Sequence, residues 1–232
     1  MRNFSGYLVL TCAAIATLLV NVENAKASVI QLTFEGLQDL ESINGFYNGG
    51  TGSLGSAGPN LGVAFSSNAL AVIDTDAGGS GNFGGEPTPD TIMFFLDGNP
   101  FMDVAAGFTT GFSTYYSAIG SAGSLTIYDG LTGTGNILAT LILPVTPSNG
   151  APDPNGAFSP LVPIFVAFSG TAKSVVFGGV ENQIGFDNVT FGSINPGPAV
   201  PEPSTLTLLS LGAVGIAISA RRRRRSQQNA AV

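Results

Sequence analysis

The stretch Ser124-Leu125-Thr126-Ile127-Tyr128-Asp129 alternates polar residues with large hydrophobic ones. Successive side chains of a β-strand point to opposite faces, so this pattern predicts a strand with one buried and one solvated face. Asp129-Gly130, followed by Gly133 and Gly135, predicts a turn that returns the chain into a second strand over Asn136–Leu143. The stretch therefore indicates an antiparallel hairpin, and with it a body built from β-strands.

On both sides of this hairpin the sequence repeats the same pattern, with short β-branched or aromatic runs separated by glycines. No charged, amphipathic segment is long enough for a good helix. Roughly ten strands predict a single all-β domain over residues 28–195, a jelly-roll-like β-sandwich whose core comes largely from the chain's 16 phenylalanines. The other predicted strands are Val29–Phe34, Val63–Ser66, Ala69–Ile73, Thr91–Leu96, Ala105–Phe112, Ile164–Phe168, Ser174–Gly178 and Ile184–Phe191. Three stretches are expected to be exposed loops: Gly45–Gly62, Asp74–Asp90 and Thr146–Pro160.

The charge of the body differs from that of the whole chain. The 232 residues carry 8 basic and 15 acidic side chains, a net charge of −7. Only Lys173 among the basic residues lies in the body, whereas only Glu23 and Glu202 among the acidic ones lie outside it. The body therefore has thirteen acidic residues and one basic residue, or about −12. Such a surface repels nucleic acid and anionic lipid, keeps an apolar domain soluble and suits divalent cations.

Several kinds of catalytic site are excluded by residues that the chain lacks. It has no histidine, and its only cysteine, Cys12, lies in the N-terminal apolar segment. Zinc sites, thiol catalysis, serine hydrolases with a histidine base and disulfides within the body are therefore excluded. We predict that the protein is not an enzyme. The alternative is a secreted hydrolase that cleaves extracellular polysaccharide with a pair of carboxylates.

The N-terminal segment has the three parts of a secretory signal peptide. Arg2 supplies a positive charge, residues 7–20 form an uncharged and largely apolar run, and Ala25-Lys26-Ala27 has the small-x-small pattern that signal peptidase accepts. A buried N-terminal helix would instead show amphipathic spacing. We predict a signal peptide over residues 1–27, with cleavage by signal peptidase after Ala27.

The C-terminal segment combines a short motif, an apolar run and a basic cluster. Pro201-Glu202-Pro203 ends a proline-rich linker over residues 196–203, and an uncharged run follows over residues 204–220. As a helix this run extends about 25 Å, at the short end of a membrane span. Five consecutive arginines follow it: Arg221, Arg222, Arg223, Arg224 and Arg225. We predict a transmembrane helix over residues 204–220 and a basic tail over residues 221–232 that the positive-inside rule places in the cytoplasm.

This ordered set of features resembles the C-terminus of PEP-CTERM proteins, the exosortase substrates of Gram-negative bacteria. The resemblance rests on Pro201, Glu202 and Pro203, the apolar run and the arginine cluster, and covers about 30 residues. It implies that exosortase recognises the Pro-Glu-Pro motif and removes the tail. The chain would then be anchored in the inner membrane only transiently, and its body would reach the cell surface or the extracellular matrix. The alternative is a plain C-terminal membrane anchor behind a proline-rich linker.

Two acidic residues lie near the two ends of the body. Glu35 closes the first predicted strand in Thr33-Phe34-Glu35-Gly36, and Asp187 lies in the last, in Gly185-Phe186-Asp187-Asn188-Val189. The first and last strands of a jelly roll are commonly neighbours. These motifs resemble those of carbohydrate-binding-module jelly rolls, which implies a structural calcium site at Glu35 and Asp187. Calcium takes about six to eight oxygen ligands, which carboxylates and backbone carbonyls can provide. The alternative is that both residues cap turns or accept backbone N–H bonds.

The body is therefore expected to be a non-catalytic structural or glycan-binding module, with exopolysaccharide as its candidate partner. The chain has no tryptophan for sugar stacking. Four tyrosines could replace it: Tyr47, Tyr115, Tyr116 and Tyr128. Asp74 and Asp76 form a weaker second candidate for calcium, and no other cofactor is predicted. Ice binding has no support, because the sequence contains no regular Thr-x-Thr array.

Overall fold

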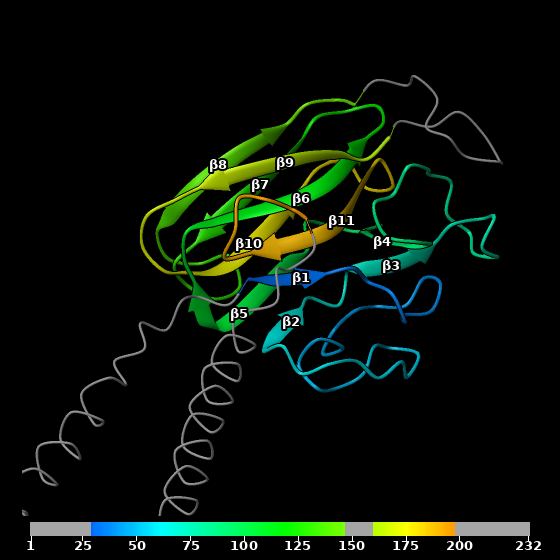
Figure 1. Ribbon diagram of the computed structural model, residues 1–232, viewed down its shortest axis with the longest axis horizontal. Coiled ribbons are helices and arrows are strands. Elements are labelled where there is room, and N and C mark those ends of the chain that lie inside the picture. Colours follow the sequence, from blue (N-terminus) through cyan, green and yellow to red (C-terminus); the bar gives the residue numbers. More distant parts are fainter. Residues whose placement is uncertain (1–28, 147–159, 198–232) are drawn as a thin grey trace, which may run out of the picture. The chain divides into compact units, whose positions relative to one another are not determined.

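The computed structural model describes residues 29–146 and 160–197. Within them the chain forms eleven β-strands in two antiparallel sheets (Figure 1). These residues include no helix that is long and apolar enough to cross a membrane. The predicted signal peptide, sorting motif, transmembrane helix and arginine cluster lie outside the described residues. The all-β prediction is confirmed.

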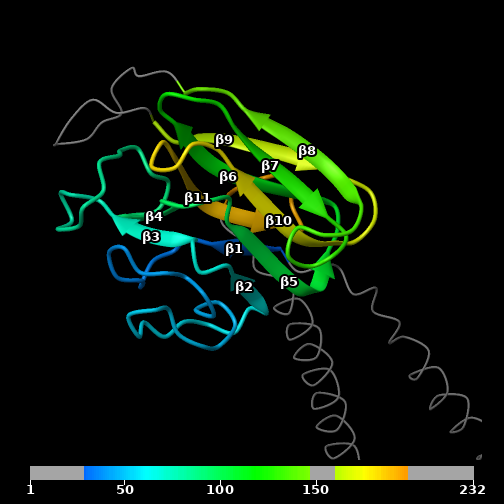
Figure 2. The ribbon, with the colours of Figure 1, turned by 180° about the vertical axis from the view of Figure 1, so that it is seen from behind.

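The two sheets pack face to face as a sandwich (Figures 1 and 2). The first has the spatial order β3 (Leu70–Ile73), β4 (Thr91–Phe94), β11 (Ile184–Phe191), β6 (Gly111–Ala118) and β9 (Val162–Ala167), with β1 (Ile30–Leu32) also paired to β11. The second has the order β2 (Val63–Phe65), β5 (Phe101–Phe108), β10 (Ala172–Gly178), β7 (Gly123–Tyr128) and β8 (Ile137–Leu143). The edge strands β8 and β9 belong to different sheets but lie next to each other at one side of the sandwich.

The hairpin that the alternating stretch predicts is formed by β7 and β8. Leu125 and Ile127 are fully buried, while the residues between and beside them point to the other face. The Asp129 carboxylate closes the connection: Oδ1 accepts a hydrogen bond from the backbone N–H of Asn136 at 2.7 Å, and Oδ2 accepts one from its Nδ2 at 2.8 Å. The turn residues therefore act as the sequence indicates.

One predicted strand is wrong. The run Ala105–Phe112 is divided between β5, which ends at Phe108, and β6, which begins at Gly111. Thr110, between the two strands, has a φ value of 79°, a left-handed backbone that a continuous strand does not adopt. The chain therefore turns at this point and passes from one sheet to the other, which accounts for the eleventh strand.

Phenylalanines fill the space between the sheets. The ring of Phe177 on β10 lies 5.0 Å from that of Phe186 on β11 and 6.2 Å from that of Phe112 on β6, both edge to face. All three side chains are fully buried. β11 is buried along its whole length, and it lies inside its sheet, with β1 and β4 paired to one side of it and β6 to the other. A strand buried in this way also encloses its polar side chains, among them Asp187.

Candidate functional site: a pair of carboxylates near the first and last strands

The two acidic residues at the ends of the body converge in the six-stranded sheet. β1 pairs antiparallel with β11, Leu32 opposite Val189, so the first and last strands are neighbours as predicted. Glu35 follows β1 and Asp187 lies on β11, close enough for the charge of Glu35 to act on Asp187. The segment Thr88–Thr91, which leads into β4, contacts both carboxylates.

Hydrogen bonds from this segment and from β11 hold the two carboxylates. Thr91 donates its backbone N–H to Glu35 Oε1 at 3.1 Å and its hydroxyl to Oε2 at 3.3 Å. Asp187 Oδ1 accepts the backbone N–H of Asn188 at 2.6 Å. Its Oδ2 accepts the Thr88 hydroxyl at 2.9 Å and the Thr88 backbone N–H at 3.3 Å. Both carboxylates therefore accept backbone N–H bonds, which ties β1, β4 and β11 together.

Burial makes the ionised forms of both residues unfavourable. It raises the pKa of Asp187 from its usual 3.8 to about 7, against the opposing effect of the hydrogen bonds, and the charge of Glu35 adds to the rise. Burial likewise raises the pKa of Glu35, and the charges of Asp90 and Glu86 raise it further. Lys173 is the only lysine or arginine among the described residues. When both carboxylates are ionised, the hydrogen bonds described above stabilise their charges. Binding of a proton or of a cation would neutralise the charge further.

The backbone around the pair is strained. Phe34, Asp90 and Asn188 have φ values of 64°, 76° and 48°, and each is the sequence neighbour of a residue of the site. Non-glycine residues adopt such values rarely, at a cost of about 1–3 kcal/mol each, and they tend to cluster at functional sites. At Asn188 the strain coincides with a β-bulge between Asp187 and Thr190, where the register with β6 shifts.

Tyr47, in the loop Gly45–Gly62, contacts Phe34, the residue that precedes Glu35. Its hydroxyl accepts the backbone N–H of Phe34 at 2.7 Å, and the two rings pack edge to face. Burial raises the pKa of the Tyr47 hydroxyl, and the charges of Asp187 and Glu35 raise it further. Four tyrosines were considered for sugar stacking. Tyr47 and Tyr116 are buried, and Tyr115 and Tyr128 are half-buried. The two buried ones offer no stacking face to a sugar, which corrects their assignment.

The donor atoms of the pair suit a hard cation. They are all oxygens, which calcium prefers over the nitrogen and sulfur ligands of transition metals. Across residues 29–146 and 160–197, no group of three or more acidic, histidine or cysteine side chains is arranged to hold a metal ion. A cation at Glu35 and Asp187 would therefore complete its shell with hydroxyl or carbonyl oxygens and water. In the second candidate pair, Asp74 is buried and accepts the backbone N–H of Thr75 at 2.8 Å, whereas Asp76 is exposed.

The residue that the sequence did not single out is Glu41, which organises the loop Gly45–Gly62. Its side chain is fully buried. Oε1 accepts the backbone N–H groups of Leu54 at 2.9 Å and Ser56 at 3.1 Å, and Oε2 accepts that of Gln38 at 2.7 Å. Burial by itself raises the pKa of Glu41, but these bonds outweigh it and lower the pKa. Most residues of the glycine-rich loop are exposed, as predicted, and a buried carboxylate anchors it to the sandwich.

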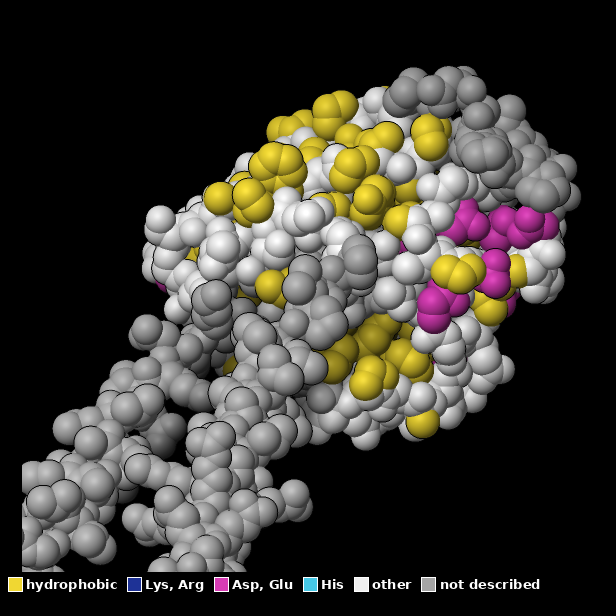
Figure 3. Space-filling view, viewed as in Figure 1, with side chains coloured by type: hydrophobic (Ala, Val, Ile, Leu, Met, Phe, Trp, Pro, Cys, Tyr) yellow, Lys and Arg dark blue, Asp and Glu magenta, His cyan; other side chains and the backbone are white. Residues whose placement is uncertain are grey.

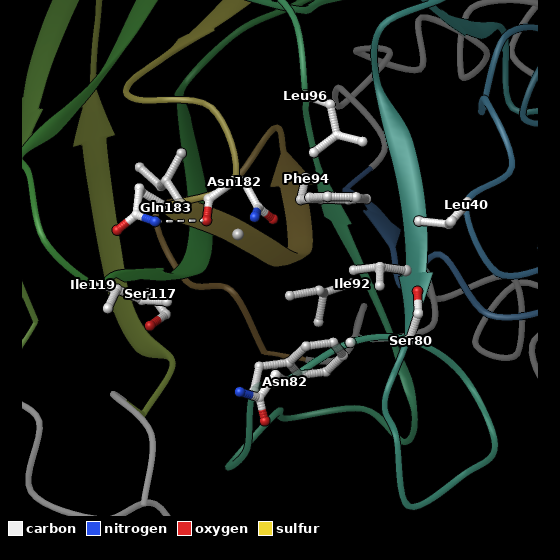
Figure 4. A pocket seen from close by; sticks show the side chains of 15 residues that line it. Leu40, Ser80, Asn82, Ile92, Phe94, Leu96, Ser117, Ile119, Asn182 and Gln183 are labelled. Carbon is white, nitrogen blue, oxygen red and sulfur yellow. Dashed lines mark hydrogen bonds between the residues drawn. The ribbon is translucent and has the colours of Figure 1, made fainter.

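A pocket of about 400 Å³ opens on the outer face of the six-stranded sheet (Figure 4). Ile92 and Phe94 of β4 form an apolar floor, and Asn82, Asn182 and Gln183 add side-chain amides around it. None of the residues that line it is charged. A hydrolase of the kind considered above needs a carboxylate pair in a cleft, and this pocket is lined by no carboxylate.

The C-terminal residues 199–224 match the PEP-CTERM protein-sorting motif. The resemblance drawn from Pro201, Glu202 and Pro203 is thereby confirmed. The motif indicates an exported protein with a C-terminal anchor and implies processing by exosortase. No protein of curated function matches the sequence.

Among solved structures, the chain is similar to a carbohydrate-binding module of lichenase 5A from Cellvibrio mixtus in complex with cellotriose, with 14% identity and a TM-score of 0.33 over 54% of this chain and 86% of the module. It is also similar to a cleaved adhesin domain of Lys-gingipain, with 13% identity and a TM-score of 0.44 over 71% of this chain and 99% of that domain. A third is a glycoside hydrolase family 43 arabinoxylan arabinofuranohydrolase from Bacillus subtilis, with 18% identity and a TM-score of 0.32 over 54% of this chain and 24% of that enzyme.

Proposed function

We propose that the protein is displayed at the cell surface or in the extracellular matrix after exosortase has processed its C-terminus, and that its body is a non-catalytic structural or glycan-binding module. The observation that carries the proposal is the match of residues 199–224 to the sorting motif. The charge of the body agrees with it, because about −12 keeps an apolar sandwich soluble outside the cell. The full burial of Asp187 agrees with a non-catalytic body, since a polymer cannot reach that carboxylate.

Replacing Pro201, Glu202 and Pro203 together with alanine is expected to abolish removal of the tail, because the enzyme would lose the motif it recognises. Chains with one epitope in the body and one at the C-terminus can be followed by immunoblotting of cell fractions. The wild-type body should lose the C-terminal epitope and reach the surface fraction, whereas the variant should keep it and stay in the membrane.

The linker residue Pro198, which precedes the matched residues, provides the control: Pro198→Ala should be processed like the wild type. Processing of the triple variant at the wild-type rate would contradict the proposal. Wild-type chains that keep both epitopes would identify the segment as a plain anchor.

For the body, we propose that Glu35 and Asp187 hold a structural calcium ion. The support is threefold: the donors are hard oxygens, both carboxylates have raised pKa values, and strained backbone surrounds them. The described residues include one basic side chain, Lys173, so calcium would supply positive charge that the side chains largely lack. The ion would thereby fasten the start of the sandwich on β1 to its last strand, β11.

The glycan-binding part of the proposal concerns the uncharged pocket. Neutral sugars present apolar ring faces and hydroxyl groups, and the pocket offers an apolar floor and side-chain amides. The double substitution Asn182→Ala and Gln183→Ala is expected to weaken binding of a neutral oligosaccharide by about tenfold, because each lost hydrogen bond is worth about 0.5–1.5 kcal/mol. Isothermal titration with neutral oligosaccharides measures this.

Asn99→Ala serves as the matched control, since Asn99 is exposed and lies outside the pocket lining. The pocket would not be the glycan site if the control and the double variant lost the same affinity, or if neither substitution changed the affinity. If the body bound no neutral oligosaccharide, the structural role would be the one that remains of the two proposed.

A further inference from the structure

One edge of the sandwich is long, apolar and without charge. β8 ends the five-stranded sheet, and no strand of residues 29–146 and 160–197 pairs with its free side. Its seven residues include no charged residue and no proline, and Ile137 and Ile142 are 59% and 63% exposed. Edge strands of natural proteins are usually shortened or carry lysine or proline, which prevents pairing with another chain. β8 has neither lysine nor proline, and on its outer side its backbone groups pair with no strand of the described residues, beside exposed apolar side chains.

The other edges differ from β8. At the opposite side of the sandwich, β2 and β3 have only three and four residues. β9, next to β8, contains Pro163, which lacks the N–H that strand pairing needs. β9 nevertheless carries no charge, and its Phe165 is 57% exposed. We call the side of the sandwich formed by Ile137–Leu143 and Val162–Ala167 the β8–β9 strip.

The distribution of charge indicates what can approach the β8–β9 strip. At about −12, two copies of the body repel each other over most of their surfaces. Residues 130–146 and 160–172, which form both edge strands and their flanks, contain no charged residue. Figure 3 shows hydrophobic side chains gathered over β8 and β9, while most of the acidic side chains in view lie on another part of the surface. A second copy of the chain can therefore approach here with the least repulsion.

We propose that the β8–β9 strip joins two copies of this chain, with β8 of one copy pairing antiparallel to β8 of the other. A bulge near Ile137 leaves Ala139–Leu143 as the regular part of β8. A two-fold axis at Leu141 pairs all five of these residues and sets Thr140 opposite Ile142 of the second copy. The five-stranded sheets then continue across the interface. This inference does not depend on the ligand or on the calcium site.

The interface is small, so the association is weak and depends on concentration. Seven residues per copy from β8, even with the side chains of β9, fall short of the about 20–30 residues that each partner contributes to a standard interface. The pairing therefore forms where chains are crowded, as on a surface that displays many copies.

Cysteine cross-linking of the full chain in exporting cells tests the register. In a Cys12→Ser background, chains with Thr140→Cys and chains with Ile142→Cys are expressed together. Facing residues of antiparallel strands have Cα atoms about 4.5–5.5 Å apart, which lies within the range for a disulfide. We expect at least about tenfold more disulfide-linked dimer than from Ala105→Cys, which is exposed on the central strand β5. Equal cross-linking at both places would overturn the proposal.

A second test uses no cysteine. Sedimentation of the full chain in mild detergent should show a mass that rises with concentration towards two copies. Ile142→Lys is expected to weaken this association at least about tenfold, which is about 1.4 kcal/mol, because it places like charges on both sides of the axis. Leu54→Lys, 58% exposed in the glycine-rich loop, is the matched control and should leave it unchanged. A single copy at every concentration, or equal effects of both lysines, would overturn the proposal.

Discussion

Replacing Asp187 with asparagine is expected to raise the free energy of unfolding at pH 8, in the presence of a chelator, by up to about 4 kcal/mol. Burial raises the pKa of Asp187 from 3.8 to about 7, and each pH unit between these values corresponds to about 1.36 kcal/mol. Between them the folded state binds more protons than the unfolded state. Wild-type stability from this group is therefore full below about pH 4 and is lost as the pH rises through 7.

Asparagine does not ionise, and its Oδ1 can still accept the Asn188 N–H, so the variant should not lose this contribution. Denaturant unfolding of both proteins at pH 5 and pH 8 measures the difference. Asp97→Asn, an exposed carboxylate outside the site, controls for the change in net charge. If the stability of Asp187→Asn depended on pH in the same way as that of the wild type, the pH dependence would come from a group other than Asp187.

Calcium should narrow the difference in stability between the two proteins. At a hundredfold excess over its dissociation constant, calcium would add about 2.7 kcal/mol to the wild type and nothing to Asp187→Asn or Glu35→Gln. The melting temperature measures this, and Asp97→Asn should keep the full response. A wild-type melting temperature that calcium leaves unchanged would contradict the calcium proposal. The pH dependence of Asp187 would stand, because it needs only the proton.

Replacing Glu41 with alanine is expected to lower the free energy of unfolding by about 4 kcal/mol. Three backbone N–H groups lose a charged acceptor, and such hydrogen bonds are worth about 1.5–3 kcal/mol each before water replaces some of them. Glu41→Gln should lose about half as much, because its amide group would face the N–H of Gln38 with another donor. Glu181→Gln, an exposed substitution, is the control for denaturant unfolding.

The pH dependence of Glu41 has the opposite sign to that of Asp187. Its hydrogen bonds hold its pKa below the usual 4.5, so it contributes stability above pH 4.5 that is lost as the pH falls through the folded pKa. Glu41→Gln should show less of this loss in acid than the wild type. Gly52→Ala should destabilise the same loop, because an added Cβ would clash with the Glu41 carboxylate. Full wild-type stability in both variants would show that the loop does not need the carboxylate.

The sequence predicts those parts of the fold that local patterns determine. The β7–β8 hairpin follows from alternation and turn residues within about twenty positions. The pairing of β1 with β11 follows from the topology of the fold class, and it brings Glu35 and Asp187 near each other. The break between β5 and β6 escapes such patterns, because the positive φ of Thr110 has no signature in the sequence.

Glu41 escapes prediction for a different reason. Two of its three partners lie 13 and 15 residues away, in a loop of no regular structure. Their positions depend on how the glycine-rich loop folds back, which neither hydrophobic periodicity nor composition reports. The same fold-back buries Tyr47, which the sequence offered as an exposed platform. Long-range side-chain to backbone bonds of this kind become visible only in three dimensions.

The single basic residue of the body bears on its resistance to proteolysis. Proteases of the trypsin type cut after lysine or arginine, and residues 29–197 offer them only Lys173. That residue lies in β10, which is hydrogen-bonded to β5 on one side and β7 on the other. A protease must bind its substrate as an extended and unpaired chain, so β10 would first have to leave both neighbours. The folded sandwich therefore offers such enzymes no accessible bond, and its lifetime among them depends on how rarely the whole second sheet opens.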